Sequence, residues 1–75
     1  MPPDAYSDMF RFTLGQCVRW TESPYQRHWV GQRRWTEREI LAPLVQYRLR
    51  FGKPEDGPLL EWARQEDLTP WEDGT

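Results

Sequence analysis

The sequence predicts an all-β domain: a small, mostly antiparallel barrel of about five strands, with a short helical turn before the last strand. Three observations lead to this fold class. Short segments in which apolar and polar residues alternate recur along the 75-residue chain. Turns rich in Gly and Pro separate these segments. The core material is largely aromatic, with five Trp, three Tyr and three Phe, and each ring can bury roughly 150–250 Å².

The domain is predicted to span residues 10–71. Residues 1–9 contain two prolines and two aspartates and are expected to form a flexible tail. Residues 72–75 are expected to be a frayed acidic tail. A chain of 75 residues forms one domain at most, and such a domain has a small core.

Two extended segments are predicted near the N-terminus. Residues 10–14 alternate Phe and Leu with Arg and Thr, and Gly15 ends the alternation. Residues 17–21 predict the second segment. The stretch "ESPYQ" at 22–26 predicts a turn, because Ser-Pro starts turns and disfavours helix.

The stretch "HWVGQRRWT" at 28–36 predicts a strand with a β-bulge. Strict alternation would leave neither face of this strand apolar. A glycine inside a strand often marks a bulge, which adds one residue and reverses the alternation beyond it. With a bulge at Gly31, Val30 and Trp35 face one interior, whereas His28 and the arginines turn outward.

The clearest strand is "LVQYRLRF" at 44–51, which predicts Val, Tyr, Leu and Phe on the inner face and Gln and Arg on the outer face. A short helix over 36–42 is possible, since Thr36 and Glu39 have the spacing of a capping box. The Gly- and Pro-rich residues 52–58 predict a loop.

The last part of the domain is ambiguous between helix and strand over residues 59–67. We favour a strand in which Leu60 and Trp62 face inward. A single turn at "RQEDL" and a short closing strand at "TPW" would follow.

The expected core has the inward-facing side chains of all these segments. They are Phe12, Leu14, Val18, Val30, Trp35, Val45, Tyr47, Leu49, Leu60, Trp62 and Leu68. This set already fills a core of this size, so some of the remaining rings are expected to be partly exposed.

Charge is unevenly distributed along the chain. Residues 27–53 carry seven basic and two acidic side chains, a net +5. Residues 54–75 carry one arginine and seven acids, a net −6. The whole chain has a formal charge of −2. We expect the two regions to neutralise one another across neighbouring strands. The other interpretation is a basic binding face.

A reducing cytoplasm is the expected location, in a bacterium or phage. Cys17 is the only cysteine, so no internal disulfide can form, whereas secreted domains of this size usually need disulfides. The N-terminal residues lack the pattern of a signal peptide, and no apolar run approaches the roughly 18 residues of a membrane helix.

Three stretches resemble small barrels of the Src-homology-3-like class, including the Tudor and KOW groups. "FTLGQCV" at 12–18 is similar to the entry into their first strand, "LVQYRLR" at 44–50 to their central strand, and "EDLTP" at 66–70 to the turn before their last strand. The chain resembles short uncharacterised bacterial or phage proteins of this kind. The resemblance implies a binding module, whose ligand can be nucleic acid, a methylated side chain, a proline-rich peptide or another protein surface.

A more remote resemblance is to the type II dihydrofolate reductases, which are also short barrels. Their active site uses a Val-Gln-Ile-Tyr strand. Residues 45–47, "VQY", match it in part, without the Ile and at an earlier strand. This remains a remote alternative.

No catalytic, metal or cofactor site is predicted. No motif connects His28, the only histidine, with Cys17, so a paired base and nucleophile are not indicated. A metal site needs about four ligands, and no spaced set is present. We therefore expect a protein that is not an enzyme and that binds no cofactor, metal or membrane.

The candidate contact residues are aromatic rings and arginines on neighbouring strands. They are Trp29, Arg33, Arg34, Trp35, Arg48 and Arg50. Trp and Arg dominate binding hot spots, so we expect an interaction module that binds another protein or forms a homodimer through this face. The alternative is a nucleic-acid-binding barrel, with rings for base stacking and arginines for phosphates.

Overall fold

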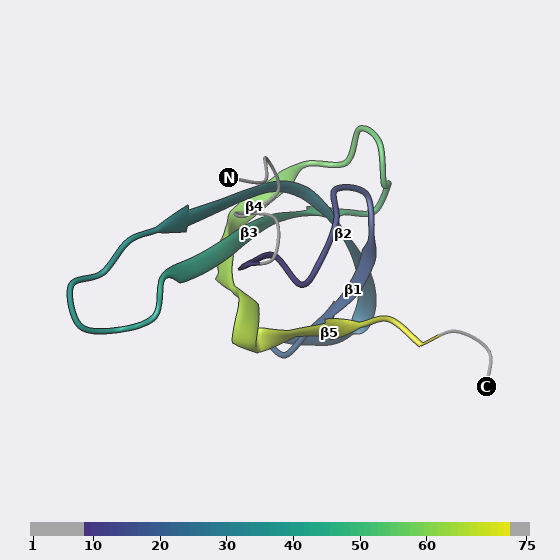
Figure 1. Cartoon of the computed structure of the whole chain (residues 1–75). Helices are drawn as coiled ribbons and strands as arrows, with labels where there is room; N and C mark the ends of the chain where they lie inside the picture. The colour runs from purple at the N-terminus through teal and green to yellow at the C-terminus, as the bar shows by residue number, and fades with distance from the viewer. Residues whose placement is uncertain (1–8, 73–75) are drawn as a thin grey trace.

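Five strands form one antiparallel sheet (Figure 1). The structure is a computed structural model that describes residues 9–72. The strands are β1 (Cys17–Trp20), β2 (Ser23–Thr36), β3 (Leu44–Phe51), β4 (Leu59–Arg64) and β5 (Leu68–Pro70). Their order across the sheet is β4-β3-β2-β1-β5.

The predicted fold class is confirmed: the domain is all-β and antiparallel, and the 3₁₀ turn η2 (Gln65–Asp67) precedes the last strand. The sheet curls around a common interior (Figure 1). It does not close, because β4 and β5 lie at its two edges. Within residues 9–72, no helix is long and apolar enough to cross a membrane.

The bulge predicted at Gly31 is present in the β2–β3 pairing. Val30 pairs with Leu49, and Gln32 pairs with Arg48, so Gly31 is the additional residue. The buried His28 and Val30 accordingly lie at even positions before the bulge, and the half-buried Arg33 and Trp35 lie at odd positions after it. A Cβ at Gly31 would lie 2.5 Å from Leu59 Cδ2, so a larger residue here requires the end of the Leu59 side chain to shift.

The core occupies the inner, concave face of the sheet. Its buried apolar residues are Phe12, Val18, Val30, Val45, Tyr47, Leu49, Ala63 and Leu68. Trp35 is half-buried and packs against this cluster, so Val30 and Trp35 share one interior as predicted. Leu14 was expected in the core and is instead 58% exposed.

The N-terminal segment packs against the core without forming the predicted extended segment at 10–14. Phe12 is buried, and its ring lies edge-on to that of Tyr47 at 5.4 Å. The Tyr47 hydroxyl accepts hydrogen bonds from the backbone N–H of Arg11 (3.0 Å) and of Phe12 (3.4 Å), and it donates to Gln65 Oε1. Burial raises the pKa of Tyr47, which keeps this hydroxyl neutral.

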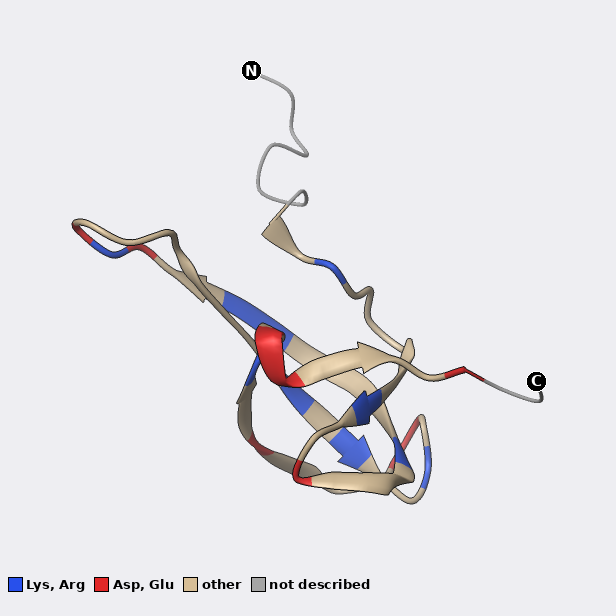
Figure 2. Cartoon of the chain, turned by 90° about the horizontal axis from the view of Figure 1, so that it is seen from below, with Lys and Arg blue, Asp and Glu red and all other residues tan. Residues whose placement is uncertain are grey.

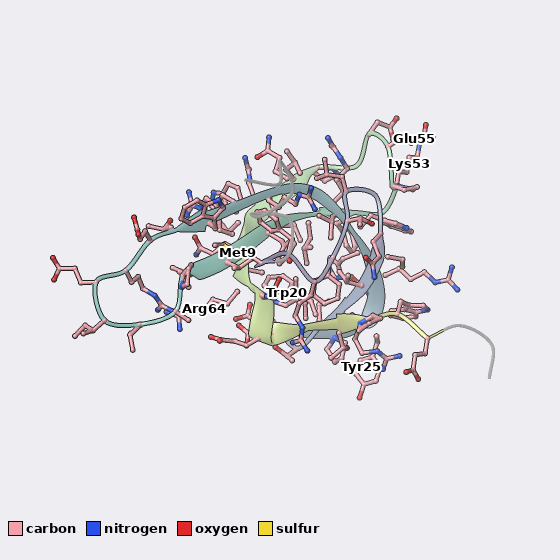
Figure 3. The ribbon with its side chains drawn as sticks, viewed as in Figure 1. Met9, Trp20, Tyr25, Lys53, Glu55 and Arg64 are labelled. Carbon is pink, nitrogen blue, oxygen red and sulfur yellow. The ribbon has the colours of Figure 1, made fainter. Side chains whose placement is uncertain are left out.

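Met9 belongs to the packed domain and not to the tail. Its side chain packs against the core, and its carbonyl accepts a hydrogen bond from Gln65 Nε2 at 3.2 Å. Figure 3 labels the Met9 side chain, at the start of the described chain. The predicted tails at 1–8 and 73–75 lie outside the described residues.

Two further local predictions are wrong. The residues 22–26 do not form a turn, because β2 already begins at Ser23 and the reversal occurs at residues 21–22. Residues 37–43 form a loop and not a helix, and this loop projects from the β2–β3 hairpin (Figure 1). Ile40 is 94% exposed and Leu41 is 63% exposed. A helix here would therefore bury no apolar face, and the capping-box spacing alone does not stabilise one.

His28 was predicted at the surface and is buried, with 1% of its area exposed. It precedes the bulge and shares the inner face with Val30. Its ring lies edge-on to Trp20 at 5.6 Å and tilted against Phe51 at 5.8 Å. Within residues 9–72, its Nδ1 atom has no hydrogen-bond partner. Burial lowers the pKa of His28 from its ordinary value of 6.5, so the neutral imidazole is favoured.

Acid is expected to destabilise the fold through His28. Because its pKa is lower in the folded state, its contribution to stability is complete above pH 6.5 and is lost as the pH falls toward the folded-state pKa. The slope approaches about 1.4 kcal/mol per pH unit between the two pKa values. Denaturant unfolding between about pH 7.5 and 5.5 measures this loss.

The matched control is His28→Phe, which retains an aromatic ring and cannot titrate. The same carboxylates titrate in both proteins, so the difference between the two pH profiles isolates His28. Parallel profiles would contradict a buried neutral imidazole.

Candidate interaction face

The strand register places four of the six predicted contact residues on the outer face of the sheet. On this face, Trp29 pairs with Arg50, and Arg34 pairs with Gln46. Arg48 lies beside them on β3 and pairs with Gln32 on one side and with Trp62 on the other. These side chains are exposed or half-buried.

The other two predicted contact residues lie on the inner face, which corrects their assignment to the contact face. Beyond the bulge, Arg33 pairs with Tyr47 and Trp35 pairs with Val45. Arg33 is half-buried: its Nη1 donates to the Phe12 carbonyl at 3.2 Å, and its guanidinium lies 4.5 Å from the centre of the Phe10 ring. Arg33 therefore holds the N-terminal segment against the sheet.

Trp62 belongs to the outer face, although the sequence analysis placed it in the core. The β3–β4 register shifts by one residue between Arg48 and Arg50, so β4 contains an irregularity of its own. This shift turns Ala63 inward opposite Tyr47 and turns Trp62 outward. No glycine or proline occurs within β4, so no residue type indicates the shift.

A cation–π contact organises the outer face. The Arg34 guanidinium lies 4.0 Å from the centre of the Trp62 ring and spans from β2 over to β4. Its Nε donates to Gln46 Oε1 at 2.9 Å on the strand between them. Contacts of this kind contribute about 0.5–1 kcal/mol at exposed sites, and here they fix the direction of the guanidinium.

The neighbouring arginines are bound to neutral acceptors. Arg48 Nε donates to the Leu60 carbonyl at 2.9 Å, and Arg50 Nη1 donates to the Gly57 carbonyl at 2.8 Å. Within residues 9–72, neither these two nor Arg34 forms an ion pair with a carboxylate. The expected neutralisation across strands therefore does not occur at these three positions.

We call this surface the outer arginine face. It consists of Trp29, Gln32, Arg34, Gln46, Arg48, Arg50 and Trp62. Figure 2 shows many of the basic residues along the strands, whereas most acidic residues lie at η2 and the loops; Glu61 lies on β4. A guanidinium has five N–H donors, and each of these arginines uses only one or two of them within the described chain. The remaining donors are available to a ligand.

An acidic cleft lies at the free edge of β4. It has a volume of about 530 Å³, and its lining includes Trp20, Trp62, Glu22, Glu61 and Asp67. Trp62 thus belongs to both surfaces, with Arg34 against its ring and the cleft beside it. The fold places opposite charges on adjoining surfaces.

A separate arginine–tryptophan cluster lies where β1, β2 and the chain after β5 meet. The guanidinium groups of Arg19 and Arg27 lie 4.7 and 5.5 Å from the centre of the Trp71 ring. The Trp71 backbone N–H bonds the Cys17 carbonyl at 3.2 Å, which extends the β1–β5 pairing by one residue. Sequence analysis did not identify this cluster, because its members lie far apart in the chain.

Within residues 9–72, no group of three or more His, Cys, Asp or Glu side chains could hold a metal ion. Cys17 is half-buried on β1. The outer arginine face therefore offers cationic hydrogen-bond donors and flat apolar rings, the chemistry of recognition of an anionic surface.

No family model matches the chain, and comparisons with curated proteins and with solved structures give no match either.

Substitution of two neighbouring residues of β2 tests which of their side chains faces the core and which faces outward. Trp35→Ala is expected to lower the free energy of unfolding by about 2–3 kcal/mol, because a half-buried ring is lost from the core. Arg34→Ala is expected to cost less than about 1 kcal/mol, because the cation–π contact with Trp62 and the hydrogen bond to Gln46 that are lost are both exposed. Urea denaturation measures both values. A larger loss of stability for Arg34→Ala than for Trp35→Ala would contradict the assignment of Trp35 to the inner face of β2 and of Arg34 to its outer face.

Proposed function

We propose that this protein is a non-enzymatic interaction module of the SH3-like small-barrel class, and that its outer arginine face binds an acidic surface of another protein. The strand order β4-β3-β2-β1-β5 and the 3₁₀ turn before β5 support the class. They agree with the three sequence stretches that resemble such barrels. The class does not define the ligand, so the proposal rests on the site.

The arrangement of Arg34, Arg48 and Trp62 carries the proposal. Arg34 is held over the Trp62 ring at 4.0 Å, and Arg48 is tied by Nε to the Leu60 carbonyl. Both guanidinium groups are therefore partly ordered before any ligand arrives, which reduces the entropy cost of binding. Arginine and tryptophan are the residues most enriched in binding hot spots.

The distance between two arginines on β3 suggests which kind of ligand fits the face. Arg48 and Arg50 project from the same face of one strand, which separates them by about 6–7 Å along the strand. Carboxylates at alternate positions of an extended acidic segment would match this spacing. Each pairing could be bidentate, since a guanidinium matches the geometry of a carboxylate.

Protein is favoured over nucleic acid by the packing of the Trp62 ring. One face of the Trp62 ring is already covered by Arg34, so a base would have to displace the guanidinium in order to stack there.

Binding can be measured with a labelled peptide of alternating Glu and Ser, using fluorescence anisotropy at several salt concentrations. The variant Arg48→Glu/Arg50→Glu is expected to bind this peptide at least about tenfold more weakly, because two attractive charges become repulsive. The matched control is Arg19→Glu/Arg27→Glu, which makes the same change in charge at the Trp71 cluster. Equal loss in the control would contradict a specific face.

Two further measurements separate the alternatives. Tight binding of an oligothymidine with a steep loss of affinity as salt rises would favour nucleic acid. Sedimentation equilibrium tests self-association, in which the outer arginine face of one copy would meet the acidic cleft of another. A dimer that the Arg48→Glu/Arg50→Glu variant abolishes would make the partner a second copy of this chain.

A further inference from the structure

A second basic site lies beyond the outer arginine face, at the base of the loop that joins β2 to β3. Four segments form a cleft of about 190 Å³: the N-terminal segment, the 37–43 loop, the start of β3 and the end of β4 with η2. Arg11, Arg38 and Arg64 each contribute a side chain to its lining. Figure 3 shows Arg64 on the side from which the 37–43 loop projects. None of the three was a predicted contact residue.

Hydrogen bonds hold the backbone of Arg11 and the side chain of Arg38 at the cleft, and neither uses a terminal N–H group of a guanidinium. The backbone N–H of Arg11 is shared between the Tyr47 hydroxyl at 3.0 Å and Gln65 Oε1 at 2.9 Å. Arg38 Nε donates to the Ala42 carbonyl at 2.8 Å, within its own loop. Tyr47 and Gln65, which anchor the N-terminal segment to the fold, therefore also place Arg11 at the cleft.

The cleft is strongly cationic. Among residues 9–72, Glu66 is the one carboxylate in its lining, against three guanidinium groups. Glu66 lies 3.6 Å from Arg64 Nη1, and both side chains are mostly exposed, at 71% and 61%. An exposed ion pair of this kind contributes little, so Arg64 can turn toward a more highly charged anion. Pro43, Leu44 and Val45 supply an apolar part of the lining, which strengthens electrostatic attraction by lowering the local dielectric constant.

We propose that the Arg11–Arg38–Arg64 cleft binds a phosphomonoester group. Three arginines facing one glutamate leave a surplus of two positive charges, which matches the charge that a phosphomonoester carries near neutral pH. Guanidinium forks also fit phosphate oxygens in bidentate fashion. The volume admits a phosphate with a small attached group and excludes a folded protein surface. This site is separate from the outer arginine face and does not depend on its function.

The test is a titration of the ¹⁵N-labelled full chain with phenyl phosphate, followed by amide chemical shifts. Sodium chloride at matched ionic strength is titrated in parallel. The variants are Arg38→Gln and Arg11→Gln, with Arg50→Gln as the control that removes the same charge from the outer arginine face. Shifts elsewhere in the spectrum show that each variant remains folded.

Saturable shifts centred on residues 11, 38 and 64–66 are expected for the wild-type chain. Arg38→Gln and Arg11→Gln are each expected to weaken binding by about tenfold, the effect of one lost charge-assisted hydrogen bond. Arg50→Gln is expected to leave the affinity unchanged.

Three results would overturn the proposal. One is the absence of saturable shifts. Another is that sodium chloride produces the same shifts, which would indicate ionic strength alone. The third is that Arg50→Gln weakens binding as much as Arg38→Gln, which would place the anion on the outer arginine face. The first two results do not bear on recognition of the acidic peptide, which is measured with the Arg48→Glu/Arg50→Glu variant.

Discussion

The additional residue at Gly31 determines which side chains of β2 face the core. Before the bulge, Val30 pairs with Leu49; beyond it, Arg34 pairs with Gln46 and Trp35 with Val45. If the first register continued, Arg34 would face Val45 on the inner side and Trp35 would be outside. Burying an unpaired guanidinium costs several kcal/mol, and the loss of the tryptophan would leave a small core incomplete. The bulge turns Trp35 inward in place of Arg34, and the arginine that it brings to the inner face, Arg33, is only half-buried and donates to the Phe12 carbonyl.

The same geometry creates the outer arginine face. Because the bulge turns Arg34 outward, its guanidinium can reach across β3 to the ring of Trp62 at 4.0 Å. That contact also requires the irregularity in β4, which turns Trp62 outward and leaves Ala63 to pack behind Tyr47. Core and contact face are therefore two consequences of the same two register shifts. The acidic residues lie at η2, at the loops and around the cleft (Figure 2), so they do not neutralise this face.

Sequence reasoning succeeded where one residue type indicates one backbone feature. Gly31 indicated the bulge, and the strict alternation of residues 44–51 predicted β3 and both of its faces. It failed where the cause is tertiary. The β4 irregularity contains no glycine, so Trp62 was placed in the core. His28 was placed outside because its burial depends on packing against Trp20 and Phe51. The N-terminal segment is held by Tyr47 and Gln65, residues distant in sequence.

The most direct test of this account is the β2–β3 register in solution, from cross-strand backbone NOEs of the labelled chain. The bulged strand predicts that Val30 is opposite Leu49 and that Gln32 is opposite Arg48, with Gly31 unpaired between them. NOEs that place Gln32 opposite Tyr47 would show an unbroken register. That result would put Arg34 inside and Trp35 outside, and it would contradict both the core and the outer arginine face.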